Sequence, residues 1–125
     1  MKVSEGRVIV TGATRGIGRA TVDAILKQGG KVVAIARDEE ALGELEAAAA
    51  DRIRALAADL TDVERVPETA KRAIDAFGGV DGLVNCAGIA NYERVSAIGL
   101  GSIGAQVRVN LIAPLLLSQA VAEHL

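Results

Sequence analysis

The sequence of 125 residues predicts an α/β fold, a doubly wound parallel sheet with the element order βαβαβαβα. Two observations carry this prediction. Short apolar runs alternate with longer segments in which apolar residues recur at helical spacing. The runs are also apolar at nearly every position, which is typical of parallel strands covered by helices on both faces.

Four apolar runs are predicted as strands, over residues 7–10, 31–36, 53–57 and 82–84. The second, KVVAIA, is rich in the β-branched residues that favour strands. An amphipathic helix is predicted after each of the first three strands. The apolar stripes of these helices are Ile17, Ala20, Thr21, Ala24 and Ile25; Leu42, Leu45 and Ala49; and Val66, Ala70, Ala73, Ile74 and Phe77.

The ends of these helices are marked by glycine pairs or a capping residue. Gly29-Gly30 ends the first helix and Gly78-Gly79 ends the third. We expect Asp62 to cap the start of the third helix. A glycine-rich stretch follows the fourth strand, and a long apolar helix is predicted from about Ile103 to the end.

Composition is that of one ordinary globular domain, residues 1–125. Hydrophobic residues make up 50% and charged residues 24%, and the formal net charge of −2 provides no basic surface for nucleic acid or anionic lipid. We find no run of about 18 apolar residues and no signal-peptide pattern, so we expect no membrane span. One cysteine, Cys86, and one histidine, His124, form neither a disulfide nor a zinc site, so we expect a cytoplasmic protein without bound metal.

A glycine loop joins the first strand to the first helix. Residues 11–18 have the sequence TGATRGIG, with the spacing Gly-x-x-x-Gly-x-Gly. In a dinucleotide site, Gly12 lets the chain turn off the strand, Gly16 lets the backbone approach a pyrophosphate, and Gly18 lets the helix pack close to the sheet. The alternative is a flexible turn without a ligand. The glycine loop lies after a buried strand and before an amphipathic helix, and this position favours the Rossmann-type dinucleotide loop.

The sequence resembles the classical short-chain dehydrogenase/reductase family at four places. These are residues 11–18, Asp59-Leu60, residues 85–88 (NCAG) and residues 109–111 (VNL). Cys86 departs from the family, which usually has a second asparagine there. The resemblance implies a single NAD(P)-binding Rossmann domain over residues 1–125, with the strand order 3-2-1-4. It also implies a truncated chain, because the family's chain is only about half complete at Leu125, and we expect the C-terminal catalytic half to be absent.

Roles for individual residues follow from the resemblance. Asp59 would hydrogen-bond the adenine amino group, Leu60 would pack beside it, and Ile17 would lie near the pyrophosphate and nicotinamide. From the residues alone, Asp59 and Asn85 could instead serve local turns. The residues expected to bind the cofactor are Gly12, Thr14, Arg15, Gly16, Ile17, Gly18, Arg37, Asp59, Leu60, Asn85, Ala87 and Gly88.

The end of the second strand bears on the choice of cofactor. A carboxylate there would bind the free 2′-hydroxyl of NAD(H), whereas cations would bind the 2′-phosphate of NADP(H). The strand leads into Arg37, and Arg15 lies on the same side of the predicted site, so we predict NADP(H). Asp38 keeps NAD(H) as the alternative, and the two arginines could also be solvated surface charges.

Hydride transfer at a carbonyl carbon needs a proton donor at the oxygen. The family uses a tyrosine with a lysine four residues later, plus a serine, but no lysine follows the one tyrosine here, Tyr92. We therefore expect Tyr92 to be a loop residue near the cofactor cleft, and Cys86 to be buried and inert. The resemblance leaves Asn110 as a proton-relay residue. Pro114 would free the Asn110 carbonyl to hold a water, or it merely kinks the helix for packing.

Three functions fit these features. We favour the cofactor-binding part of an NADP(H)-dependent oxidoreductase that interconverts a carbonyl and an alcohol, a part expected to be inactive alone. The alternatives are a stand-alone, non-catalytic dinucleotide-binding module and an interaction protein that has lost its ligand. Arg15, Arg37 and Asp59 argue against the last. The apolar last helix and the free edge of the fourth strand predict a homo-oligomer, or pairing with the missing half.

Overall fold

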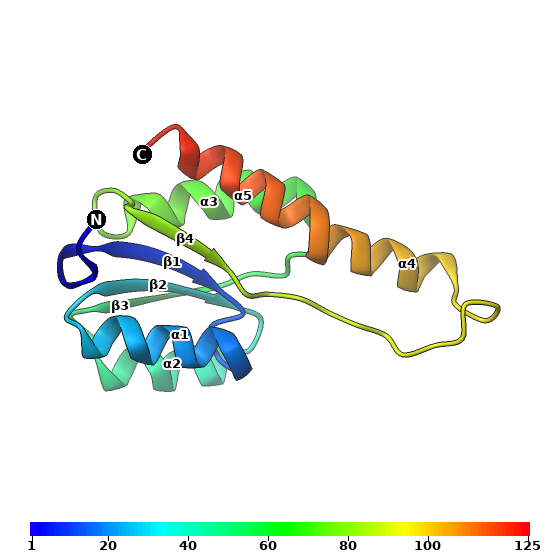
Figure 1. The fold of residues 1–125 in the computed structure, drawn as a ribbon, viewed down its shortest axis with the longest axis horizontal. Helices are drawn as coiled ribbons and strands as arrows, with labels where there is room; N and C mark the ends of the chain where they lie inside the picture. Colours follow the sequence, from blue (N-terminus) through cyan, green and yellow to red (C-terminus); the bar gives the residue numbers. More distant parts are fainter.

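The computed structural model describes Met1 to Leu125 and has the predicted α/β architecture (Figure 1). Its one sheet is made of the parallel strands β1 (Arg7–Thr11), β2 (Lys31–Ala36), β3 (Ile53–Ala57) and β4 (Gly82–Asn85). Their order is β3-β2-β1-β4, which confirms the predicted order 3-2-1-4. Since all four strands are parallel, their carboxyl ends meet at one edge of the sheet.

Helices cover both faces of this sheet (Figure 1). The helices α1 (Gly16–Lys27) and α2 (Glu39–Ala48) lie on one face, and α3 (Val66–Asp75) and α5 (Ala113–Ala122) lie on the other. The helix α4 (Leu100–Val107) continues into α5 but extends beyond the sheet, and a long connection from β4 follows it outward.

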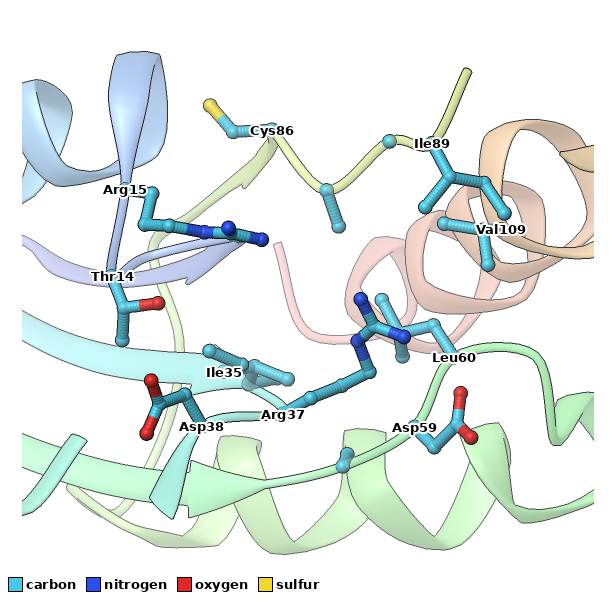
Figure 2. A pocket seen from close by; sticks show the side chains of 15 residues that line it. Thr14, Arg15, Ile35, Arg37, Asp38, Asp59, Leu60, Cys86, Ile89 and Val109 are labelled. Atoms are coloured by element: carbon cyan, nitrogen blue, oxygen red, sulfur yellow. The ribbon is translucent and has the colours of Figure 1, made fainter. Parts of the chain in front are cut away.

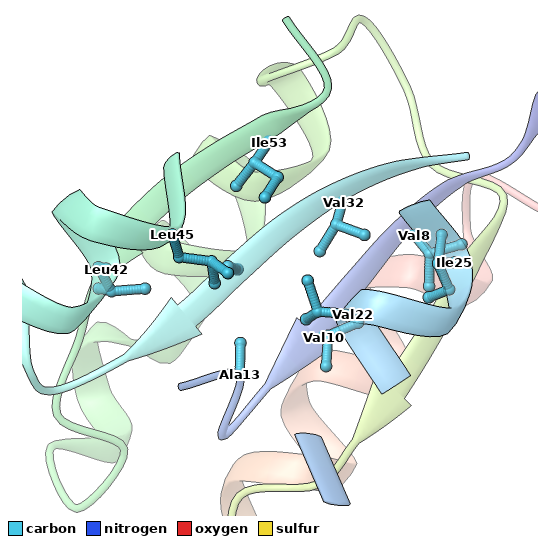
Figure 3. Close-up of a cluster of buried hydrophobic side chains, with 10 residues drawn as sticks. Val8, Val10, Ala13, Val22, Ile25, Val32, Leu42, Leu45 and Ile53 are labelled. Atoms are coloured by element: carbon cyan, nitrogen blue, oxygen red, sulfur yellow. The ribbon is translucent and has the colours of Figure 1, made fainter. Parts of the chain in front are cut away.

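The sheet divides the core into clusters of buried side chains. On one face, Val22 of α1 and Leu42 of α2 point toward Val10 and its neighbours in the strands (Figure 3). Alternate strand residues, among them Ile9 and Val33, pack on the opposite side with α3. Because the strands are buried on both faces, nearly every position in β1 and β2 is apolar.

The third helix begins differently from the prediction. A 3-10 turn (Val63–Arg65) precedes it, and the side chain of Asp62 caps no helix. Instead, α3 starts at Val66 with Pro67 in its first turn, where the missing N–H has no helical partner to lose. The predicted cap at Asp62 is therefore wrong.

The last helix is longer than predicted and contains a π segment. It begins at Leu100, not near Ile103, and residues Arg108–Ile112 form the π segment η3 between α4 and α5. There the N–H of Ala113 donates to the carbonyl of Arg108, five residues back. This wider turn ends directly before Ala113 and Pro114, and Pro114 has no N–H to donate.

This continuous helix also bears on the prediction that the chain has no membrane span. Residues Leu100–Ala122 form a 23-residue helix with a mean hydropathy of 1.4, long and apolar enough to cross a membrane by length and composition alone. The prediction of no membrane span looked for an unbroken apolar run, which Arg108 and Asn110 interrupt here, and it stays a prediction. Core helices meet the same criterion, and α5 buries Ala113, Leu117 and Val121.

Candidate functional site

A cleft of about 490 Å³ opens at the carboxyl ends of the strands (Figure 2). It lies where β4 is placed on the opposite side of β1 from β2, which is the usual ligand position in an open α/β sheet. Its volume falls within the range of small-molecule sites, about 300–1,000 Å³. The predicted cofactor-binding residues that line it are Gly12, Thr14, Arg15, Arg37, Asp59, Leu60, Ala87 and Gly88.

The glycine loop forms one wall of the cleft and leaves no room for larger residues. Gly12 has φ +62°, and a Cβ there would lie 2.9 Å from the backbone N of Ala87. A Cβ on Gly18 would overlap the carbonyl oxygen of Gly12. The turn after β1 and the close packing of α1 therefore both depend on glycine.

Gly16 differs from these two glycines because the space beside it is open. Its φ is +54°, and nothing lies within 4 Å of a Cβ built there. It is the first residue of α1, and the preceding residue, Arg15, provides no side-chain cap. The N–H groups of the first turn are therefore available to an anionic ligand, which is the feature that a dinucleotide pyrophosphate uses.

Thr11 positions the loop that forms the opposite wall. Its side chain is 1% exposed. Its Oγ1 accepts hydrogen bonds from the backbone N–H of Cys86 at 3.1 Å and of Ala87 at 3.0 Å. This role was not predicted from the sequence, although a threonine at the end of an otherwise apolar buried strand is a signal for such a bond, because a buried hydroxyl needs a partner.

The side chain of Asn110 holds the same loop in place at Ile89, the residue after Gly88. Its Oδ1 accepts from the N–H of Ile89 at 2.9 Å, and its Nδ2 donates to the carbonyl of Ile89 at 2.7 Å. A Cβ on Gly88 would lie 3.4 Å from that Oδ1, so the approach is close. The side chain thus positions the loop, and its main chain belongs to the π segment, a feature common near functional sites.

Arg15 and Arg37 both extend into the cleft (Figure 2). Neither forms an ion pair, since the salt bridges of the chain join Arg7 to Asp81, Arg19 to Asp23 and Arg65 to Asp62. Two unpaired guanidinium groups in one cleft favour a ligand with several negative charges.

Each of the two carboxylates that line the cleft accepts hydrogen bonds from neighbouring residues of the chain. Asp38 caps α2, since its Oδ1 accepts from the N–H of Ala41 at 3.0 Å. The Oδ1 of Asp59 accepts from the hydroxyl of Thr61 at 2.7 Å and from its N–H at 3.0 Å. These bonds, aided by the charge of Arg37, lower the pKa of Asp59. The local-turn alternative for Asp59 is thus realised, and neither of these bonds uses its Oδ2.

Several predicted residues lie outside the lining of the cleft. Gly16, Gly18 and Asn85 do not line it, and the Nδ2 of Asn85 donates to Ser118 at 3.5 Å. Ile17 is 80% exposed and lies in a separate groove with Val3.

Two further expectations on this loop need correction. Tyr92 is 98% exposed and does not line the cleft, because the connection after residue 89 leads away from the sheet. Cys86 is only partly buried and lines the cleft, so the prediction of a buried Cys86 was wrong. No group of three or more His, Cys, Asp or Glu side chains is arranged to hold a metal ion.

The chain belongs to the short chain dehydrogenase family, which it matches over residues 6–125. It is 36% identical over 113 residues to Oxidoreductase BOA17 of Botryotinia fuckeliana, an alignment covering 90% of this chain and 41% of that protein. The chain spans about half the length of the curated relatives it matches.

Solved structures share the fold. A short chain dehydrogenase from Burkholderia cenocepacia in complex with NADP has a TM-score of 0.88 at 33% identity, covering 100% of this chain and 53% of that one. A metagenomic short-chain oxidoreductase in complex with NADP has a TM-score of 0.85 at 34% identity, covering 94% of this chain and 55% of that one.

Proposed function

We propose that the protein is an NADP(H)-dependent oxidoreductase that interconverts a carbonyl and an alcohol, and that residues 1–125 are its cofactor-binding part. The observation that carries this proposal is the pair of unpaired cations, Arg15 and Arg37, beside an uncapped helix N-terminus in one cleft. Solved relatives in complex with NADP add support, as do relatives that are oxidoreductases. When bound, the nicotinamide would donate or accept the hydride.

The residues of the chain divide the work of binding. The first turn of α1 would hold the pyrophosphate, with Gly16 allowing close approach. Arg15 and Arg37 would bind the 2′-phosphate of the adenine ribose. Thr11 and Asn110 would hold the loop over residues 85–89 in position without touching the ligand through their own side chains.

We propose NADP(H) over NAD(H) because Arg15 and Arg37 have no ion-pair partner in the cleft, whereas Asp38 accepts a hydrogen bond within the chain. NAD(H) stays the alternative, because only Oδ1 of Asp38 is engaged at the start of α2 and a carboxylate can bind a ribose 2′-hydroxyl through its other oxygen. The neighbouring Arg37 has no such engagement. The cleft holds two arginines and two carboxylates, and the arginines are the charged groups that remain free to bind a phosphate.

Residues 1–125 do not contain the tyrosine–lysine pair that would act as the proton donor. No lysine follows Tyr92 in the sequence, so no Tyr-x-x-x-Lys pair exists in this chain. We propose that the chain alone binds cofactor but transfers no hydride, and that Asn110 serves the proton relay of the whole protein. A stand-alone dinucleotide-binding module is the alternative. We propose that the protein is cytoplasmic.

We also propose that the protein self-associates, or that this part pairs with a C-terminal half. The continuous helix exposes a series of large apolar side chains, and such surfaces are usually covered. They are Leu100, Ile103, Val107, Leu111 and Leu115.

Substitution of Arg37 tests the cofactor proposal. In the whole protein, Arg37→Asp should weaken NADPH binding by at least about tenfold and leave NADH binding unchanged or tighter, as measured by fluorescence titration. The control is Arg19→Ala, because Arg19 is paired with Asp23 outside the cleft. An unchanged NADPH-to-NADH ratio in Arg37→Asp would contradict NADP(H) preference. Hydride transfer by the whole protein with carbonyl substrates separates an enzyme from a binding module.

A further inference from the structure

The two edges of the sheet use their backbone groups differently. The edge strands are β3 and β4. A strand at an edge presents a row of N–H and C=O groups with which a strand from another molecule can pair. Whether such pairing occurs depends on what already occupies the outward-facing groups.

The pairing of β3 with β2 shows which groups of β3 face outward. The N–H of Val32 donates to the carbonyl of Arg52, and the N–H of Ala58 donates to the carbonyl of Ala36. In a parallel pair, alternate residues of a strand bond to the same neighbour. The backbone groups of Ile53, Ala55 and Ala57 therefore point away from the sheet.

Three of these outward groups already have partners within the chain. The N–H of Ala55 donates to Oε2 of Glu46, on α2, at 3.0 Å. The N–H of Ile53 donates to the carbonyl of Ala49 at 2.9 Å. The carbonyl of Ile53 accepts from Nη1 of Arg54 at 3.1 Å.

The outer edge of β4 has no comparable cover. The hydrogen bonds of the chain include none to its outward backbone groups, and the side chain of Asn85 bonds Ser118. The difference arises from α2, whose last turns run along β3 and bring a carboxylate beside the strand.

We propose that Glu46 and Arg54 seal the β3 edge and prevent a second copy of this chain from adding its own β3 strand there. A second strand would need the N–H of Ala55 and the carbonyl of Ile53, so it would displace both side chains. It would also bring the Glu46 carboxylate, already half-buried, into a strand interface without a partner, which is costly.

Hydrogen exchange tests the seal directly. In the whole protein at low micromolar concentration, Glu46→Ala should make the Ala55 amide exchange at least about tenfold faster. Glu46→Gln retains a side-chain carbonyl that accepts this bond and should keep most of the protection. The matched control is Glu44→Ala, because Glu44 is exposed on the same helix and makes no bond to β3. Unchanged exchange at Ala55 in Glu46→Ala would overturn the proposal.

Measuring self-association tests whether loss of the seal lets two copies pair through β3. Light scattering should show a concentration-dependent rise in mass for Glu46→Ala beyond that of the unchanged protein and of Glu44→Ala. Adding Ala57→Pro, which removes an outward N–H that the sheet does not use, should return the mass to that of the unchanged protein. If Glu46→Ala does not fold, Arg54→Ala takes its place in the same scattering experiment. A mass that does not rise, or a rise that survives Ala57→Pro, would overturn the proposal.

Discussion

The carboxamide of Asn110 brackets the backbone of Ile89, accepting from its N–H at 2.9 Å and donating to its carbonyl at 2.7 Å. These bonds tie the segment after β4 to the π segment of the last helix. One wall of the cleft is thus held by a residue that does not line it. The conformation of this loop depends on a helix from a later part of the chain.

Removal of the Asn110 side chain should therefore loosen the loop. Each hydrogen bond contributes about 1 kcal/mol, so Asn110→Ala should weaken NADPH binding by about tenfold or more, as measured by fluorescence titration. The matched control is Asn91→Ala, since Asn91 also joins the loop to α4, through Ser102, but lies beyond the cleft. Equal losses in the two variants would contradict a specific role for Asn110.

Thr11 supports the same wall from the strand side. Thr11→Val keeps the shape of the side chain but leaves the N–H groups of Cys86 and Ala87 without an acceptor. Unsatisfied buried groups cost about 1–3 kcal/mol, so urea denaturation should show a free energy of unfolding lower by that amount. Thr11→Ser retains the hydroxyl and should recover most of the loss. If the serine variant is no more stable than the valine variant, the hydroxyl is not the cause.

The pH dependence of stability should reflect the pairing of Arg7 with Asp81. The guanidinium of Arg7 donates to both carboxylate oxygens, at 2.9 and 3.1 Å, and its backbone N–H donates to Oδ2. These hydrogen bonds lower the pKa of Asp81 to about 2. Because the folded-state pKa lies below the unfolded value, the pair stabilises the fold above about pH 4, and this contribution is lost as the pH falls toward 2.

Thermal unfolding from pH 6 to 2 measures this contribution. The unchanged protein should lose stability over this range more steeply than Asp81→Asn, which has no carboxylate to protonate there. Asp23→Asn is the control, because the Arg19–Asp23 pair is exposed and spans one helix turn. Parallel curves for the unchanged protein and Asp81→Asn would show that Asp81 is not the titrating group.

The sequence predicted what repeats regularly and missed what depends on distant contacts. The parallel strands, the glycine loop and the apolar faces follow from periodicity and from the βα connection after β1, whereas the strand order was implied by the family resemblance. The partners of Thr11 and Asn110 lie far away in the sequence, so no local pattern reveals them. Aspartate is a common helix cap, so the sequence predicted a cap at Asp62, but α3 starts later, with Pro67 in its first turn. The cofactor cleft was predicted as a set of residues, and the local turn of Asp59 was one of the alternatives, whereas the capping bond of Asp38 was not predicted.

Substitution by alanine should have opposite effects on the free energy of unfolding at Gly18 and at Gly43. Gly18→Ala places a methyl group on the carbonyl oxygen of Gly12, and α1 has to move off the sheet to relieve it. Overpacking costs about 1–3 kcal/mol, so the free energy of unfolding should fall by at least this much, with weaker NADPH binding. Gly43 lies within α2, where a Cβ meets nothing within 4 Å. Gly43→Ala should raise the free energy of unfolding by roughly 0.5–1 kcal/mol, because alanine favours helix, and leave binding unchanged. Urea denaturation of both variants checks this, and a neutral Gly18→Ala would mean that α1 does not need its close approach to β1.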